Sequence, residues 1–286
     1  MNRRKRLAVL SAIMILAACI GGFIVPAGAD NQLYVENEWN FADGSMDVSG
    51  GIPENASGVL DRIRRNGVLR VATEYPDPEG AEMKLAARIA ERMGVKLEII
   101  PADYMQVLPA LSEDQCDLTI SAVAFTPGRA SAYTLSKGYY YPDNGSVTGF
   151  VVKEEHKEFY TSKADLEDKV LIARSNSLQE ALTAEEVHSY KEFRRVSSIQ
   201  TVFEAVQYGK ADAGVMDLET ARNYIESHPD CGLAVVEGFT LQPNQHYLGY
   251  RAAAKKGEVQ LMYFVNGVID EVLESGEYLR WNGDAQ

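Results

Sequence analysis

The stretch TVFEAVQYGKADAGVMDLETARNYI, residues 201–225, contains one complete helix–strand–helix unit. Apolar residues recur at helical spacing over 201–208, and Gly209 follows as a typical helix terminator. The apolar run at 213–216 predicts a short buried strand, and helical periodicity resumes over 218–225. A strand enclosed by two helices is typical of a parallel sheet that is covered by helices.

The same alternation runs through the rest of the chain. Further strands are predicted at 68–73, 96–100, 117–122, 149–152, 170–173, 193–196 and 233–236, and further helices at 60–65, 83–93, 105–111, 178–182 and 258–274. The pattern starts again after the strand at 149–152, which predicts two α/β lobes. A cleft between two lobes is a common binding place for a small ligand.

The composition describes an ordinary globular protein with an acidic surface. Of the 286 residues, 46% are hydrophobic and 24% are charged, and the formal net charge is -13. Such a surface repels phosphate backbones, so the sequence argues against nucleic-acid binding.

Residues 1–29 have the features of an export signal and are excluded from the fold. A basic segment at 3–6 precedes an apolar run, and two processing sites compete. Cys19 ends a sequence similar to a bacterial lipobox and would be lipidated, whereas Ala27-Gly28-Ala29 fits ordinary cleavage. An uncleaved membrane anchor is the third alternative. All three place the protein outside the cytoplasm, either in the periplasm or at the outer face of the cell membrane.

Residues 30–57 contain Asn, Gly, Asp, Ser and Pro with few periodic apolar positions, which predicts a linker. Cys116 and Cys231 are predicted to be small buried thiols rather than a disulfide, because free cysteine usually behaves as a compact core residue. The four histidines show no metal-ligand spacing, and no phosphate-binding loop or nucleophile turn is present. No metal and no cofactor is therefore expected.

Several fragments, in their order along the chain, resemble the bacterial solute-binding proteins of family 3, the polar amino-acid receptors of ABC importers. The fragments are GVLRVA at 67–72, LAARIAERMG at 85–94, VLPAL at 107–111, DLTI at 117–120, TPGR at 126–129, SKGYY at 136–140, AVQYGKADAGVMD at 205–217, VN at 265–266 and GEY at 276–278. Their shared order, rather than any one fragment, carries the resemblance, which spans residues 58–286.

The resemblance implies a two-lobed, periplasmic-binding-protein-like type II α/β fold with two hinge strands. The first lobe would comprise 58–147 plus 238–286, and the second 148–237. The hinges would lie near 146–151 and 233–237, and the lobes would close around the ligand by a hinge motion. The implied protein is a monomer that binds an amino-acid-like solute without catalysis and delivers it to an ABC transporter permease.

Two residues of the first lobe are predicted to bind the carboxylate of the ligand. Arg129 has a planar guanidinium that donates two parallel hydrogen bonds to a carboxylate, and the family places it at the cleft. Two alternatives are open for Thr126: it only caps the following helix, or it caps the helix and also donates its hydroxyl to the ligand.

The family pairs an acid at the position of Asp217 with the ligand ammonium, although Asp is also a favoured helix cap. Ser175 and Asn176 replace the Gly-Thr usual in the family, where N–H groups at a helix start bind carboxylates. The aromatic rings of Tyr75 and Phe125 are predicted to line the cleft.

One departure from the family is a shortened loop at 77–82, a segment that normally forms a wall of the pocket. Two alternative functions remain open. One is a periplasmic dehydratase on the same fold, with Glu82 as the candidate acid. The other is a ligand-sensing module that signals through another protein.

Overall fold

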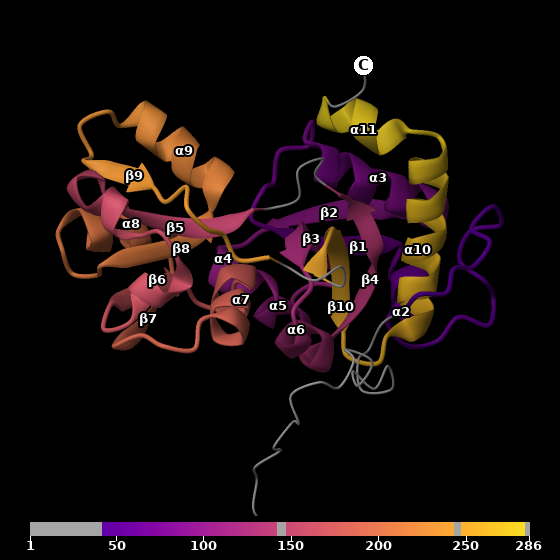
Figure 1. The fold of residues 1–286 in the computed structure, drawn as a ribbon. Coiled ribbons are helices and arrows are strands. Elements are labelled where there is room, and N and C mark those ends of the chain that lie inside the picture. The colour runs from indigo at the N-terminus through magenta and orange to yellow at the C-terminus, as the bar shows by residue number, and fades with distance from the viewer. Residues whose placement is uncertain (1–41, 142–146, 243–246, 284–286) are drawn as a thin grey trace, which may run out of the picture. The chain divides into compact units, whose positions relative to one another are not determined.

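Two five-stranded sheets organise the protein (Figure 1). The computed structural model describes residues 42–141, 147–242 and 247–283, which belong to one compact unit. Both sheets contain parallel and antiparallel strand pairs, so the expected α/β class is confirmed.

The first sheet has the order β2-β1-β3-β10-β4. Its strands are β1 (Val68–Thr73), β2 (Lys96–Pro101), β3 (Leu118–Ala124), β4 (Tyr133–Tyr140) and β10 (Tyr250–Lys255). The first three are parallel, whereas β10 runs antiparallel to both β3 and β4. A strand from the end of the chain thus completes a sheet begun near residue 68.

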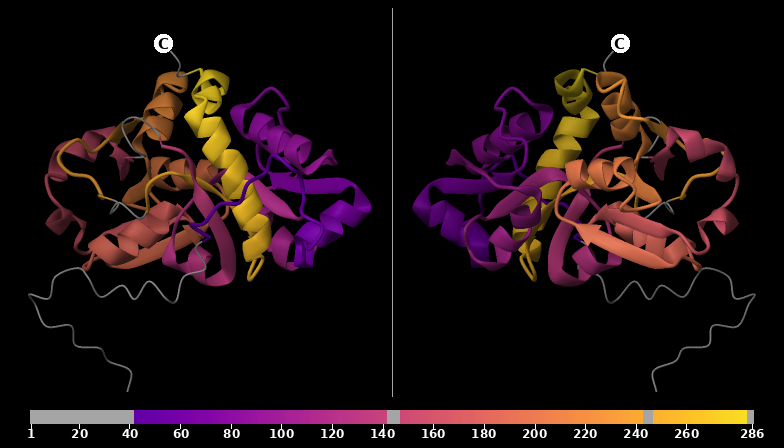
Figure 2. Two further views of the ribbon diagram at one scale, coloured as in Figure 1. Left: turned by 90° about the vertical axis from the view of Figure 1, so that its right-hand side faces the viewer. Right: turned by 90° about the vertical axis from the view of Figure 1, so that its left-hand side faces the viewer.

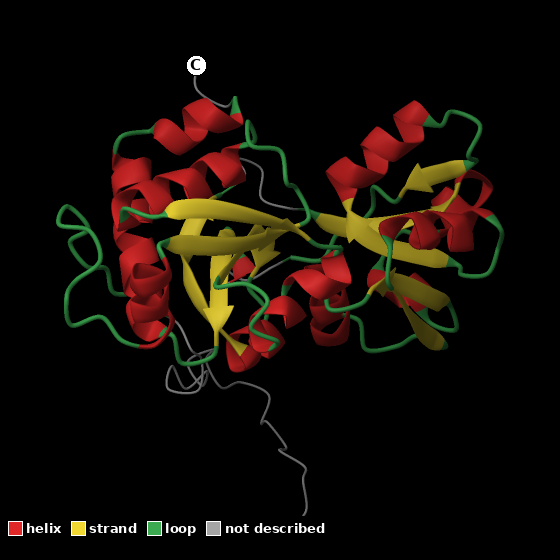
Figure 3. Ribbon diagram, turned by 180° about the vertical axis from the view of Figure 1, so that it is seen from behind, coloured by secondary structure: helices red, strands yellow, loops and turns green. Residues whose placement is uncertain are grey.

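Helices cover both faces of this sheet, as Figure 3 shows. One face carries α2 (Gly58–Asn66), α3 (Ala81–Met93), α10 (Val259–Glu274) and α11 (Glu277–Asn282), whose apolar sides share one core cluster. The helix α10, seen at full length in Figure 2, buries nine of its residues. The other face carries α4 (Tyr104–Val107), α5 (Pro109–Ser112) and α6 (Pro127–Ala132).

The second sheet has the order β7-β6-β8-β5-β9. Its strands are β5 (Thr148–Lys153), β6 (Val170–Arg174), β7 (Glu192–Val196), β8 (Ala213–Asp217) and β9 (Leu233–Val235). The strands β6, β7 and β8 are parallel, and β5 runs antiparallel to both of its neighbours.

The helices around this sheet are α7 (Leu178–Glu186), α8 (Ile199–Gln207) and α9 (Leu218–Ser227), with 3-10 helices η2 (Glu154–Phe159) and η3 (Lys163–Leu166). The helices α8 and α9 pack with β5, β6 and β8 in a second apolar cluster. The helix–strand–helix unit predicted from residues 201–225 is thereby confirmed as α8, β8 and α9.

The prediction of a linker over 30–57 is wrong for residues 42–57. Ala42 and Val48 are buried in the core, and Met46 N donates a hydrogen bond to Tyr263 O at 3.0 Å. Gly267 in α10 makes this contact possible, because a Cβ there would lie 2.2 Å from Met46 O. The segment therefore belongs to the folded body, even though its apolar residues follow no period.

Cys116 and Cys231 are both buried free thiols, as predicted. Within the described ranges, no helix has the length and hydropathy needed to cross a membrane. The predicted leader at 1–29, the lipidation site Cys19 and linker residues 30–41 lie outside the described residues. The lobe boundaries at 147/148 and 237/238 stay predictions.

Candidate functional site

Arg129 lies in the short helix α6, directly after β3. The N-cap of α6 is Thr126, whose hydroxyl accepts a hydrogen bond from Arg129 N at 3.2 Å. The predicted capping role of Thr126 is therefore confirmed. The cap fixes the first turn of α6 and with it the start of the Arg129 side chain.

The guanidinium of Arg129 is buried and bonded to neutral oxygens. Its Nη1 donates to Ala124 O at 2.7 Å, and its Nη2 donates to Tyr104 Oη at 3.0 Å and to Asn176 O at 2.7 Å. Its Nε is buried and has no hydrogen-bond partner among the described residues. Asn176 belongs to the segment that precedes α7, so this side chain connects residues associated with the two sheets.

No carboxylate of the described residues forms an ion pair or hydrogen bond with Arg129. Burial lowers the pKa of the guanidinium, and the charge of nearby Arg174 lowers it further. A buried cation without an anionic partner is destabilising, since carbonyl dipoles replace only part of its hydration. The site is therefore suited to an anion.

Ser175 and Asn176 do not present free amides at the start of α7. Ser175 N donates to Val196 O at 2.8 Å, and Asn176 N donates to a carboxylate oxygen of Glu180 at 2.6 Å. The helix cap is Ser177, which accepts from Glu180 N at 3.1 Å. The contact with the site comes instead from the Asn176 carbonyl, turned toward Arg129 by a left-handed backbone with φ 57°.

Three further residues complete the surroundings of Arg129 and were missed by the sequence analysis. Tyr104 donates its hydroxyl to Asn176 O at 3.1 Å. The guanidinium carbon of Arg174 lies 3.4 Å from the centroid of the Tyr104 ring, a cation–π contact. Glu74 forms a loose ion pair with Arg174 at 3.7 Å. This group holds two cations and one carboxylate, which leaves an excess positive charge.

Asp217 is the N-cap of α9. Its Oδ1 accepts from Thr220 N at 2.9 Å and from the Thr220 hydroxyl at 3.1 Å. Burial raises the pKa of Tyr250 to about 12, and the charge on Asp217 contributes to this shift. Asp217 therefore lies near enough to β10 for its charge to act on the first sheet.

The two predicted aromatic residues differ in their surroundings. Tyr75 is 52% exposed, so its ring is free to contact a solute. Phe125 is fully buried and packs edge-on against Tyr247, with ring centroids 5.5 Å apart. Phe125 is a core residue in this structure and presents no surface to a ligand.

Glu82 is a buried carboxyl at the start of α3. Its Oε1 accepts from Ala122 N at 2.6 Å and from the Tyr139 hydroxyl. Its Oε2 is buried and has no hydrogen-bond partner within the described ranges. Burial raises the pKa of Glu82 despite these two donors. Ala122 has φ 45°, an unusual value for a residue with a Cβ, and Glu82 holds that backbone in place.

The sequence and the fold are similar to those of known proteins. A family model described as bacterial extracellular solute-binding proteins, family 3, matches residues 70–282. The cyclohexadienyl dehydratase of Pseudomonas aeruginosa is 23% identical over 236 residues, which are 78% of this chain and 87% of the relative. The membrane-bound lytic murein transglycosylase F of Yersinia pestis is 29% identical over 191 residues. That match covers 62% of this chain but only 38% of the transglycosylase.

Solved structures show the same fold. An amino acid ABC transporter substrate-binding protein from Streptococcus pneumoniae, bound to L-arginine, is 25% identical with a TM-score of 0.63. The match covers 78% of this chain and 96% of that one. An ancestral arginine-binding protein bound to glutamine is 26% identical with a TM-score of 0.60, covering 75% of this chain and 96% of that one. The expected two-lobed type II fold is thereby confirmed.

Proposed function

Because the chain belongs to the bacterial extracellular solute-binding proteins of family 3, we propose that it binds an amino acid or a similar carboxylate-bearing solute. The bound solute is delivered to the permease of an ABC importer. The protein acts as a monomer outside the cytoplasm, either free in the periplasm after cleavage or held at the membrane by a lipid at Cys19 or by an N-terminal anchor.

The observation that carries this proposal is the buried Arg129, which pairs with no carboxylate of the residues that the structure describes. Its neighbours are two carbonyl oxygens, one hydroxyl and a second guanidinium, that of Arg174. A ligand carboxylate supplies the missing negative charge and takes up donor positions of the guanidinium. Burial strengthens this attraction because the effective dielectric constant is lower than in water.

The ammonium of the ligand requires an acid, and Asp217 is proposed for that role. Its Oδ1 caps α9, so an ammonium would share this carboxylate with the helix start. Thr126 is proposed to add a hydroxyl near Arg129, and the exposed ring of Tyr75 is proposed to contact the ligand side chain. Asn176, whose carbonyl holds Nη2 of Arg129, must give way when the carboxylate binds there.

A thermal-shift screen against amino acids and amines tests the proposal. A ligand at 100 times its Kd raises the free energy of unfolding by about 2.7 kcal/mol. The variants Arg129→Ala and Arg129→Lys should both lose most of the shift, since Lys cannot form the bidentate pair. A full shift in Arg129→Ala would show that the carboxylate is bound elsewhere.

A second candidate, a dehydratase, is favoured by Glu82, whose raised pKa makes it a suitable proton donor. In such a reaction a C–O bond breaks, and the leaving hydroxide takes the Glu82 proton to form water. A neighbouring C–H bond breaks as its electron pair forms the C=C bond, and its proton returns to the Glu82 carboxylate. Mass spectrometry of a candidate solute after incubation tests this alternative. Loss of one water with the wild type, but not with Glu82→Gln, would support it, whereas recovery of unchanged solute would support a receptor.

A further inference from the structure

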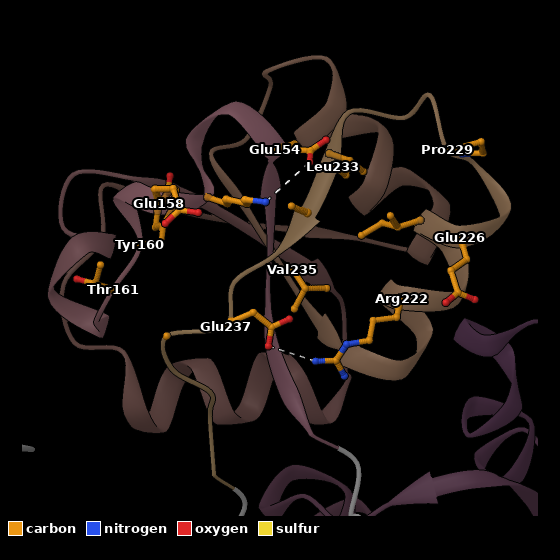
Figure 4. Close-up of a pocket in the computed structure, with 14 residues that line it drawn as sticks. Glu154, Glu158, Tyr160, Thr161, Arg222, Glu226, Pro229, Leu233, Val235 and Glu237 are labelled. Carbon is orange, nitrogen blue, oxygen red and sulfur yellow. Dashed lines mark ion pairs between the residues drawn. The ribbon is translucent and has the colours of Figure 1, made fainter.

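A groove of about 610 Å³ lies at the free edge of the second sheet, where β9 passes between η2 and α9 (Figure 4). We call it the β9 groove and define it by Glu154 and Glu158 of η2, Ile225 and Glu226 of α9, and Leu233 and Val235 of β9. It shares no residue with the surroundings of Arg129 described above.

Part of the hydrogen-bonding backbone of β9 faces away from β5 and pairs with no strand in the described part of the chain. Val236 N donates to Phe150 O at 2.9 Å, and Gly232 O accepts from Glu154 N at 2.9 Å, so even-numbered residues face β5. In an antiparallel pair the alternate residues face the other way. The N–H and C=O groups of Leu233 and Val235 therefore point to the open edge, where no loop or side chain of the described residues bonds them.

The partly buried side chains of Ile225 and Val235 give this edge an apolar surface between acidic walls, and Leu233 lies buried beneath them. Ile225, Leu233 and Val235 belong to the apolar cluster under α9. Glu154 and Glu237 form ion pairs with Lys157 and Arg222, at 3.8 and 3.5 Å, and these exposed pairs are weak. Glu158 and Glu226 have no ion pair within the described part of the chain, so the walls keep an excess of negative charge.

We propose that the β9 groove binds an extended segment of a partner protein that carries Lys or Arg at alternate positions. The segment adds a strand to β9, and its backbone bonds the outward groups of Leu233 and Val235. Alternate side chains of a strand point to opposite faces, so those that face α9 meet Ile225 and Glu226, while the alternate basic ones on the side of η2 reach Glu158. The free backbone edge and the acidic walls thus select the same kind of segment.

Binding of a fluorescein-labelled peptide of alternating lysine and valine to the full-length chain tests this proposal. We expect a Kd on the order of micromolar. The same peptide methylated at alternate backbone nitrogens keeps its charge but cannot pair with a strand, so it should bind at least about tenfold more weakly. Amide exchange at Leu233 and Val235 should slow when the unmodified peptide is added.

Two variants locate the site. The double variant Glu158→Lys plus Glu226→Lys should weaken binding by more than about tenfold. Val235→Pro removes one outward N–H that β5 does not use, so the fold should persist while binding is lost. Absence of binding at millimolar peptide would overturn the proposal, as would equal affinity for the methylated peptide or unchanged binding in the double variant. The response to amino acids through Arg129 should be unaffected in the double variant, whose two residues lie outside the predicted hinge at 233–237.

Discussion

Nη2 of Arg129 donates a 2.7 Å hydrogen bond to the backbone carbonyl oxygen of Asn176. Arg129 follows a strand of the first sheet, and Asn176 follows a strand of the second, so this bond joins segments 47 residues apart. A neutral carbonyl is a weaker partner for a guanidinium than a carboxylate is. The bond therefore places a replaceable acceptor where the proposed ligand would bind.

Substitutions of Asn176 test whether its left-handed backbone conformation is needed. Its φ of 57° is tolerated by Asn and Gly but unfavourable for Ala. We expect Asn176→Ala to lower the free energy of unfolding by about 1 kcal/mol and Asn176→Gly to change it by only a few tenths. Urea denaturation measures both values. Equal stability of the two variants would show that the left-handed conformation is not needed.

A substitution of Gly267 tests whether residues 42–57 pack against α10. A Cβ at this position would overlap Met46 O and Val48 Cγ1, at 2.2 and 2.8 Å. We expect Gly267→Ala to destabilise the protein by about 1–3 kcal/mol in chemical denaturation. The control Gly128→Ala, also in a helix, meets nothing closer than 4.0 Å and should stabilise by about 0.5–1 kcal/mol. A stabilising Gly267→Ala would mean that the segment does not lie against α10.

The buried carboxyl of Glu82 should make the free energy of unfolding depend on pH. Burial raises its pKa above the ordinary 4.5, so the folded state favours the protonated carboxyl. The resulting stabilisation is complete below pH 4.5 and is lost as the pH rises through the pKa of the folded state. The Tm of Glu82→Gln relative to wild type should therefore increase with pH above 4.5. A difference that stays constant or falls with pH would contradict this assignment.

Tyr139 provides a second variant for the same experiment. Its hydroxyl donates to Glu82 and favours the ionised carboxylate. Tyr139→Phe removes that donor and should raise the Glu82 pKa further, so stability should fall more steeply toward neutral pH. Thermal unfolding of wild type and both variants over one pH series measures this. A shallower pH dependence in Tyr139→Phe would indicate that Glu82 is held by other groups.

The elements with a clear hydrophobic period could be predicted from the sequence, and those without one could not. The helix α3 and the strands β1, β6 and β8 were found because their apolar residues follow one face or fill one buried run. The strand β4 was missed because it buries Thr134 and Ser136 among its tyrosines. The strand β10 was missed because its centre is three alanines, which have low strand propensity.

Only part of the site could be predicted from the sequence, because contacts between distant segments leave no local pattern. Thr126, Arg129 and Asn176 lie together, although Asn176 contributes its carbonyl rather than its amide. Tyr104 and Arg174 were missed because their contact joins distant segments with no local pattern. Phe125 was expected in the cleft, but a sequence cannot distinguish a ring that lines a site from one that fills the core behind it.

The central claim is that Arg129 receives the carboxylate of the ligand. Isothermal titration of the wild-type protein with the best solute of the screen, and with the same solute as its carboxamide, measures this contact directly. A charged carboxylate bound to a buried guanidinium predicts at least about a 100-fold weaker Kd for the carboxamide, or about 2.7 kcal/mol. Equal affinity for the two compounds would contradict the account.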